Sequence, residues 1–267
     1  MARRRAGHDH RRARIEGGVG SMVGSRTETY ESGEVTGTAS VLVVQTLPAF
    51  AVDGAADARP LSRAAQRLVT YLALRDRPVR RAEVAHALWA DSSEEHGAAS
   101  LRTTLWRIGR VHRDLVRATA ERLSLSDTAA VDVQAASSLA RSLASAGGEL
   151  PGDSEAVIGL LSTDLLPDWY DDWLFVFRER WRQLRLHALE CLAERLGEAG
   201  RFSEAIDAAL TAVDAEPLRE SAHRCLIRVH LLEGNRGEAV RAYRALAELL
   251  HDELGVRPSP GVRALLA

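Results

Sequence analysis

The sequence predicts a mainly α-helical protein in which a small α+β unit is followed by an all-α unit of repeated helix pairs. Two observations carry this prediction. Short β-rich runs surround three helical patterns in the first half of the chain, and segments 34 residues apart resemble each other near its C-terminal end. The 267 residues are enough for two ordinary domains, each with its own hydrophobic core.

Residues 1–39 are rich in Arg, Gly, Ser and Thr and show no hydrophobic periodicity. We predict that they form a disordered tail. The arginines within residues 3–5 and 11–14 could add nonspecific phosphate contacts, and an extension without a role is the alternative.

Residues 40–133 are predicted to form the α+β unit. Short strands are expected at 41–47, 50–52, 115–118, 122–125 and 131–133, and helices at 62–74 (with Ser62 as N-cap), 81–89 and 98–112, the last after a polar loop at 91–97. Small strands, three helices and a closing hairpin are typical of a winged helix. In that fold the third helix enters the DNA major groove, and we expect the hairpin to contact the flanking backbone or the minor groove.

The third predicted helix, residues 98–112, has one apolar face and one basic face. Leu101, Leu105 and Ile108 follow the i, i+4, i+7 spacing of a buried stripe. Arginine is the commonest reader of guanine edges and also binds phosphate well. The candidate DNA-binding residues lie on or beside the opposite face and in the hairpin: Ala99, Arg102, Thr103, Trp106, Arg107, Arg110, Arg113, Arg117 and Arg122. Trp106 should be partly exposed in the free protein.

The charge distribution agrees with a local DNA-binding surface. The whole chain has a net charge of −2, but residues 98–123 hold six arginines against two acidic residues, a net charge of +4. One module would therefore meet a polyanion while the rest of the chain would not. An ordinary solvated helix face is the alternative interpretation.

Catalytic, cofactor and metal sites are not expected. The two cysteines, Cys191 and Cys225, are too few for a disulfide framework or a cysteine zinc cage. The histidines lack metal-binding spacing, and no nucleophile motif or phosphate-binding P-loop occurs. No apolar run approaches the ~20 residues of a membrane helix, and no signal peptide is recognisable. We therefore expect a cytoplasmic, nucleoid-associated protein that is not an enzyme and does not bind a membrane.

Residues 134–267 are predicted to form the all-α unit. Helices are expected around Leu139 and Leu143, over 154–161, and in a long segment that ends near Ala199. In the long segment Trp173, Phe177, Trp181 and Leu184 share one face, which we interpret as core-facing. Three nearby carboxylates, Asp168, Asp171 and Asp172, are interpreted as helix-start capping residues rather than metal ligands.

A repeat of 34 residues relates Gly200 to Gly234 and Ala205 to Ala239. Cys191 and Cys225 are also 34 residues apart, and Pro217 ends the second helix of the first repeat. Glycine at the turn and alanine at a close helix crossing are typical of tetratricopeptide-like repeats. Such repeats bury their apolar faces by stacking, and the array has a concave surface.

The order of these parts resembles the SARP-like bacterial transcriptional activators, in which an OmpR-type winged helix precedes a bacterial transcriptional activator domain. The resemblance runs from about Val41 to the C-terminus. Its most telling stretches are Ala87-Leu-Trp, Leu101-Arg-Thr-Thr-Leu-Trp-Arg-Ile-Gly-Arg, Leu165-Leu-Pro-Asp-Trp-Tyr-Asp-Asp-Trp and Asp252-Glu-Leu-Gly-Val-Arg-Pro-Ser-Pro.

The resemblance implies a sequence-specific activator, regulating a pathway of secondary metabolism. Its implied partners are double-stranded DNA at direct repeats in promoters, RNA polymerase, and a second copy of the chain on DNA. Two positions depart from the family: Gly109 stands where a basic residue is frequent, and Trp106 where a small polar one is. A base preference therefore does not transfer from the family. The competing hypothesis is a tetratricopeptide-type scaffold whose winged helix binds protein rather than DNA.

Overall fold

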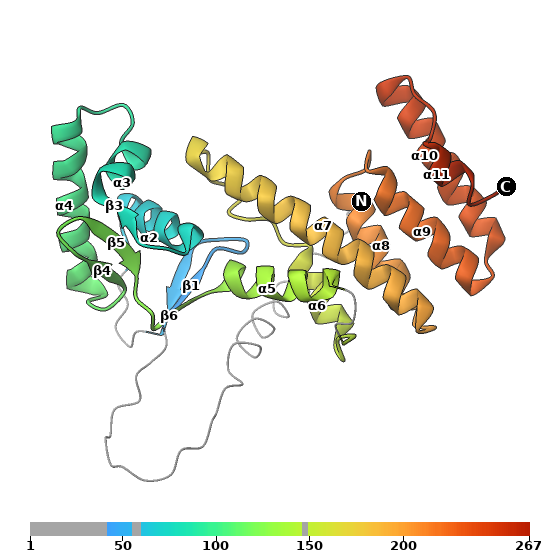
Figure 1. Ribbon diagram of the computed structural model, residues 1–267, viewed down its shortest axis with the longest axis horizontal. Helices are drawn as coiled ribbons and strands as arrows, with labels where there is room; N and C mark the ends of the chain where they lie inside the picture. The colour runs from blue at the N-terminus through green and yellow to red at the C-terminus, as the bar shows by residue number, and fades with distance from the viewer. Residues whose placement is uncertain (1–41, 55–59, 146–148) are drawn as a thin grey trace, which may run out of the picture. The chain divides into compact units, whose positions relative to one another are not determined.

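The computed structural model describes residues 42–54, 60–145 and 149–267 (Figure 1). The tail predicted for residues 1–39 lies outside the described residues. The described chain has the predicted fold class, with a winged helix followed by an all-α helical repeat region.

The strands within residues 42–54 and 60–145 form two three-stranded sheets. In the first sheet, β1 (Leu42–Gln45) pairs antiparallel with β2 (Ala51–Asp53) and parallel with β6 (Ala129–Val131). In the second sheet, β5 (Arg122–Leu125) pairs antiparallel with β3 (Val79–Arg80) and β4 (Val116–Ala118). The hairpin of β4 and β5 is the wing.

Among the described residues of this part, three helices complete the fold: α2 (Arg63–Arg75), α3 (Arg81–Leu88) and α4 (Glu94–Val111). The predicted inward stripe of the first helix is buried, with Ala65, Leu68 and Leu72 at most 2% exposed. α4 packs against both α2 and α3, so these two helices support its inner face.

One strand was missed, and two predicted boundaries were wrong. Strand β3 was missed because two residues are too few to show a period. Residues 94–97 were predicted as loop but begin α4, because the hydroxyl of Ser93 caps the helix by accepting from the His96 amide at 3.4 Å. Asp132 and Val133 were predicted as strand but begin α5, where the Asp132 carboxylate accepts from the Val133 amide at 2.6 Å.

The C-terminal part is helical. Its elements are α5 (Asp132–Ala144), α6 (Ser154–Leu161), the 3₁₀ turn η1 (Asp172–Leu174), α7 (Phe175–Glu198), α8 (Phe202–Ala215), α9 (Glu220–Glu233), α10 (Arg236–Leu254) and α11 (Pro260–Arg263). Consecutive helices from α7 to α10 pack against each other (Figure 1).

The 34-residue repeat corresponds to equivalent backbone positions. Gly200 follows α7 and Gly234 follows α9, with φ of 74° and 88°, a region that glycine enters without steric cost. Ala205 and Ala239 are fully buried in α8 and α10. The predicted aromatic stripe faces the core less uniformly. Trp181 is buried, and Trp173 and Phe177 are half-buried against the core.

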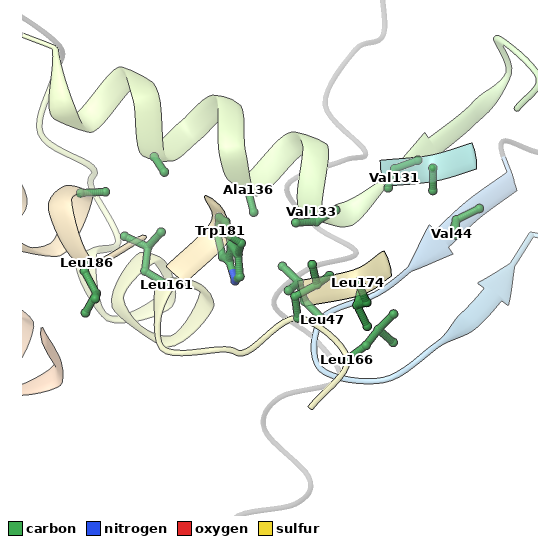
Figure 2. Close-up of a cluster of buried hydrophobic side chains, with 14 of the residues drawn as sticks. Val44, Leu47, Val131, Val133, Ala136, Leu161, Leu166, Leu174, Trp181 and Leu186 are labelled. Atoms are coloured by element: carbon green, nitrogen blue, oxygen red, sulfur yellow. The ribbon is translucent and has the colours of Figure 1, made fainter. Parts of the chain in front are cut away.

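The expectation of one core for each unit was wrong. One hydrophobic cluster runs from β1 through the start of α5 into α6 and α7 and on to α9. Figure 2 shows part of it, where Val44, Leu47, Val131 and Val133 lie near Leu166 and Leu174. A second, smaller cluster lies farther along the repeats: Ile227, Ala239, Leu246, Leu250 and Val262. The winged helix therefore shares its core with the first helices of the repeat region.

Candidate nucleic-acid interface

Helix α4 is held by one buried face. The buried residues are Gly97, Leu101, Thr104 and Ile108, while the predicted Leu105 is only half-buried. Thr104 takes the place of Leu105 in the buried stripe. Its hydroxyl donates to the Ser100 carbonyl at 2.8 Å, so the buried hydroxyl has a hydrogen-bond partner within its own helix. A threonine is hard to assign to a core face from an apolar pattern alone.

The opposite face of α4 is exposed. Ala99, Arg102, Thr103, Trp106, Arg107 and Arg110 all lie in solvent, and 61% of Trp106 is exposed. The hydroxyl of Thr103 donates to the Ala99 carbonyl at 3.1 Å, so its single donor is used within the helix. Arg113 is exposed too, but it follows the end of the helix instead of lying on its flank.

Trp106 and Arg110 are in contact on this face. The guanidinium carbon of Arg110 lies 5.0 Å from the centroid of the Trp106 ring, within the range of a cation–π interaction. The i, i+4 spacing of the two residues on a helix brings their side chains together.

The first turn of α4 has the opposite charge. Glu94 and Glu95 lie there, where they favour the N-terminal end of the helix dipole. Their charges would repel phosphates, so the basic surface of the helix is confined to its later turns, from Arg102 onward.

The wing carries two of the predicted arginines. Arg117 and Arg122 are both exposed on β4 and β5. Arg117 forms an ion pair with Asp127, a partner that the sequence pattern did not indicate. Because 60% of Arg117 and 77% of Asp127 are exposed, phosphate can compete for this arginine.

The turn of the wing, between β4 and β5, is attached to the start of α3. The Arg81 side chain donates from Nε to the Thr119 carbonyl at 2.9 Å, and the Arg81 amide donates to the Glu121 carbonyl at 2.9 Å. These bonds fix the wing near the helices, so the arginines of α4 and of the wing belong to one supported unit.

His112 lies at the C-terminal end of α4 and is buried. Burial lowers the pKa of its imidazole, because the charged form loses hydration. Its Nδ1 atom has no hydrogen-bond partner among the described residues.

Comparison with known proteins identifies the C-terminal part. Residues 114–267, more than half of the chain, match the family described as "Bacterial transcriptional activator domain". The chain belongs to this family.

The chain is also similar to regulatory protein AfsR of Streptomyces griseus, to which it is 28% identical over 209 residues. AfsR of Streptomyces coelicolor is also 28% identical, over 212 residues. Each match covers 74% of this chain and 21% of AfsR, so the chain spans about a fifth of the length of these relatives.

The fold is similar to that of a solved structure, "Mycobacterium tuberculosis EmbR in complex with low affinity phosphopeptide". The TM-score is 0.60 at 24% identity, and the similarity covers 85% of this chain and 64% of the EmbR chain. At this identity the comparison supports the fold.

The activator domain contacts the winged helix through the segment 165–173, one of the stretches on which the family resemblance rests. The Arg63 guanidinium lies 3.8 Å from the centroid of the Trp169 ring. Tyr71 meets Trp173 edge to face, with 5.2 Å between the ring centroids. The Leu166 amide donates to the Thr46 carbonyl at 3.2 Å. This segment therefore connects the two parts of the chain.

Asp171 belongs to the same contact, and its interpretation as a capping residue was wrong. It precedes η1, but its side chain makes no cap hydrogen bond. It accepts instead from Arg67 Nε of α2 at 2.6 Å and from the Trp173 indole at 3.2 Å. Sequence spacing could not reveal a partner more than a hundred positions away.

Asp132 makes a second connection. Its carboxylate accepts from the Thr46 amide at 2.7 Å, the Thr46 hydroxyl at 2.6 Å and the Leu47 amide at 2.8 Å. Burial raises the pKa of Asp132, while these hydrogen bonds act in the opposite direction. The start of α5 is thereby joined to the end of β1.

No group of three or more His, Cys, Asp or Glu side chains is placed to hold a metal ion within residues 42–54, 60–145 and 149–267. Over the same ranges, no helix combines the length and the apolar character needed to cross a bilayer.

Proposed function

We propose that the chain is a sequence-specific DNA-binding activator whose helix α4 enters the major groove. The observation that supports this proposal is the exposed face of α4, where Arg102, Arg107 and Arg110 surround Trp106. A major groove admits an α-helix, and the opposite face of α4 is anchored in the core.

The wing supplies the second contact of the proposal. Arg122 and Arg117 approach the flanking backbone or the minor groove, while Arg113 lies beside the end of α4. Phosphate contacts of this kind fix the register of a protein on DNA, and contacts to base edges supply sequence preference.

The rest of the proposed function concerns the activator domain. The regulator binds direct repeats in promoters as a pair of chains, recruits RNA polymerase through its helical repeats, and controls a pathway of secondary metabolism in the cytoplasm at the nucleoid. The membership in the activator family supports this assignment.

Selection of bound sequences from a random DNA pool tests the proposal. Purified protein should enrich a direct repeat, and the affinity for that repeat should fall steeply with salt, because bound phosphates release counterions. Retention of protein partners without salt-dependent DNA binding would instead favour the scaffold hypothesis.

Two substitutions test the role of the helix. Arg107→Ala or Arg110→Ala should weaken DNA binding without unfolding the protein. The loss of a base contact should cost ~1–3 kcal/mol of binding free energy. The loss of a phosphate contact should lower the slope of log affinity against log salt concentration by about one. Binding like that of the wild type by both variants would show that α4 is not the reading helix.

A further inference from the structure

The pair of Trp106 and Arg110 has a structural property that the other arginines of the proposed interface lack. Arg110 lies over an exposed aromatic ring, at 5.0 Å from its centroid. A contact with the face of a ring restricts the side chain but uses none of the five N–H donors of the guanidinium.

The other candidate arginines are different. Arg117 is engaged by a carboxylate, that of Asp127, which accepts a hydrogen bond from its Nη1. For Arg102 and Arg107 the structure shows no hydrogen bond, ion pair or ring contact with any described residue, so nothing shown there restricts their rotamers. Arg110 combines a restricted orientation with available donors.

The surroundings of the pair leave room for a base edge. A Cβ atom built on Gly109 would meet no atom within 4 Å, so the helix surface is open directly beside Arg110. Trp106 also lies opposite the buried Leu101 and Ile108, so the pair faces away from the core.

We propose that Trp106 determines specificity by holding Arg110 for a bidentate hydrogen bond to O6 and N7 of one guanine. The proposal rests on the DNA binding proposed above and assigns its central base contact. Fixing an arginine on a base costs free energy, because the side chain loses rotamer freedom. A side chain that is already restricted loses less conformational entropy on binding. Trp106 is in this respect a positioning residue for Arg110.

The experiment uses the full chain and the direct repeat obtained by selection. Each guanine of the repeat is replaced in turn by 7-deazaguanine, which lacks the N7 acceptor, and dissociation constants are measured for the native and the replaced DNA. At one guanine in each half-site the replacement should weaken wild-type binding roughly 5- to 150-fold, which corresponds to ~1–3 kcal/mol at tenfold per 1.4 kcal/mol.

Substitutions then assign the contact. Arg110→Ala should lose the discrimination between guanine and 7-deazaguanine at that position. Trp106→Ala should lose much of this discrimination although Arg110 is present. Trp106→Phe should retain most of it, because phenylalanine still offers a ring face. Arg107→Ala is the matched control on the same helix and should leave the discrimination intact.

A double-mutant cycle provides the second measurement. The effects of Trp106→Ala and Arg110→Ala on affinity should be non-additive by more than about threefold, whereas those of Trp106→Ala and Arg107→Ala should add within roughly twofold. Circular dichroism of each variant checks that the fold is intact.

Three results would overturn the inference. The first is an unchanged ratio of dissociation constants for 7-deazaguanine and guanine DNA in Trp106→Ala. The second is additivity of Trp106→Ala and Arg110→Ala. The third is a wild type whose affinity is insensitive to 7-deazaguanine at every position. A wild type without salt-dependent DNA binding would refute the proposed function itself and would be recognised before any variant is made.

Discussion

Asp171 and Arg67 connect the activator domain to the winged helix through a hydrogen bond of 2.6 Å from Arg67 Nε to the carboxylate. The same carboxylate lies 3.5 Å from Nη2 of Arg63, and only 10% of the Asp171 side chain is exposed. Two cations of α2 therefore meet one nearly buried anion from the turn before η1. Such a contact resists rotation of one part against the other.

Replacement of this anion should destabilise the protein. Asp171→Ala leaves Arg67 without its charged partner and should lower the free energy of unfolding by about 1.5–3 kcal/mol. Urea unfolding measures the change through the midpoint at an unchanged slope. Asp168→Ala, at an exposed aspartate three positions earlier, is the control and should stay within ~0.5 kcal/mol. Equal midpoints for the two variants would contradict the role of Asp171.

The buried His112 should make stability depend on pH. Because its pKa in the folded protein is lowered below the ordinary value of 6.5, the unfolded chain binds more protons in the interval between the two values. The contribution of His112 to stability is therefore complete above pH 6.5 and is lost as the pH falls toward the lowered pKa.

His112→Gln should consequently show a smaller loss of stability than the wild type between pH ~7 and ~5. Urea unfolding at a series of pH values gives the slope of unfolding free energy against pH for the wild type and for the variant. His86→Gln, at an exposed histidine of α3, should keep the slope of the wild type. A slope in His112→Gln equal to that of the wild type would show that this imidazole does not titrate differently on folding.

The repeat alanines should not tolerate added volume. Ala205 and Ala239 are fully buried, and a Cβ atom built on Gly197 would lie 4.0 Å from that of Ala205. Ala205→Leu or Ala239→Leu should cost about 1–3 kcal/mol by overpacking. Ala245→Leu on the exposed side of α10 is the control and should change the thermal midpoint little. Equal midpoints for all three variants would exclude a close helix crossing at these alanines.

The isolated winged helix should fold less well than the same residues do in the full chain. A fragment of residues 41–133 lacks Leu166 and Leu174, which share a core with Val44 and Val131. We expect a lower midpoint, a shallower transition and binding of a hydrophobic dye, since apolar surface is left exposed. A cooperative transition at the midpoint of the intact protein would show that the shared core contributes little.

Several parts of the fold could be predicted from sequence because they depend on local patterns. The stripe of α2, the exposed face of α4 and the 34-residue period each follow from spacing within a short segment. The inward position of Thr104 could not be predicted, since a hydroxyl that bonds to its own helix looks polar in sequence.

Contacts between distant segments could not be predicted from the sequence either. Asp171 was assigned to a helix start because carboxylates favour that position, yet its partner Arg67 lies in another element. The ion pair of Arg117 with Asp127 was missed for a different reason: both residues belong to the wing region, but no sequence pattern pairs them. The predicted DNA-binding residues are brought to exposed positions, and their contact with DNA stays a prediction.

The continuous core has a consequence for how a winged helix can be exchanged between such proteins. A recombination event that joined a foreign winged helix at residue 133 would separate Val131 and Val133 from Leu166 and Leu174. An exchanged segment that keeps its packing must therefore include residues 165–173 and the start of α7 together with α4. Chimaeras joined at residue 133 should need compensating substitutions on both sides of the junction. Chimaeras that transfer the larger segment, up to the start of α7, should not.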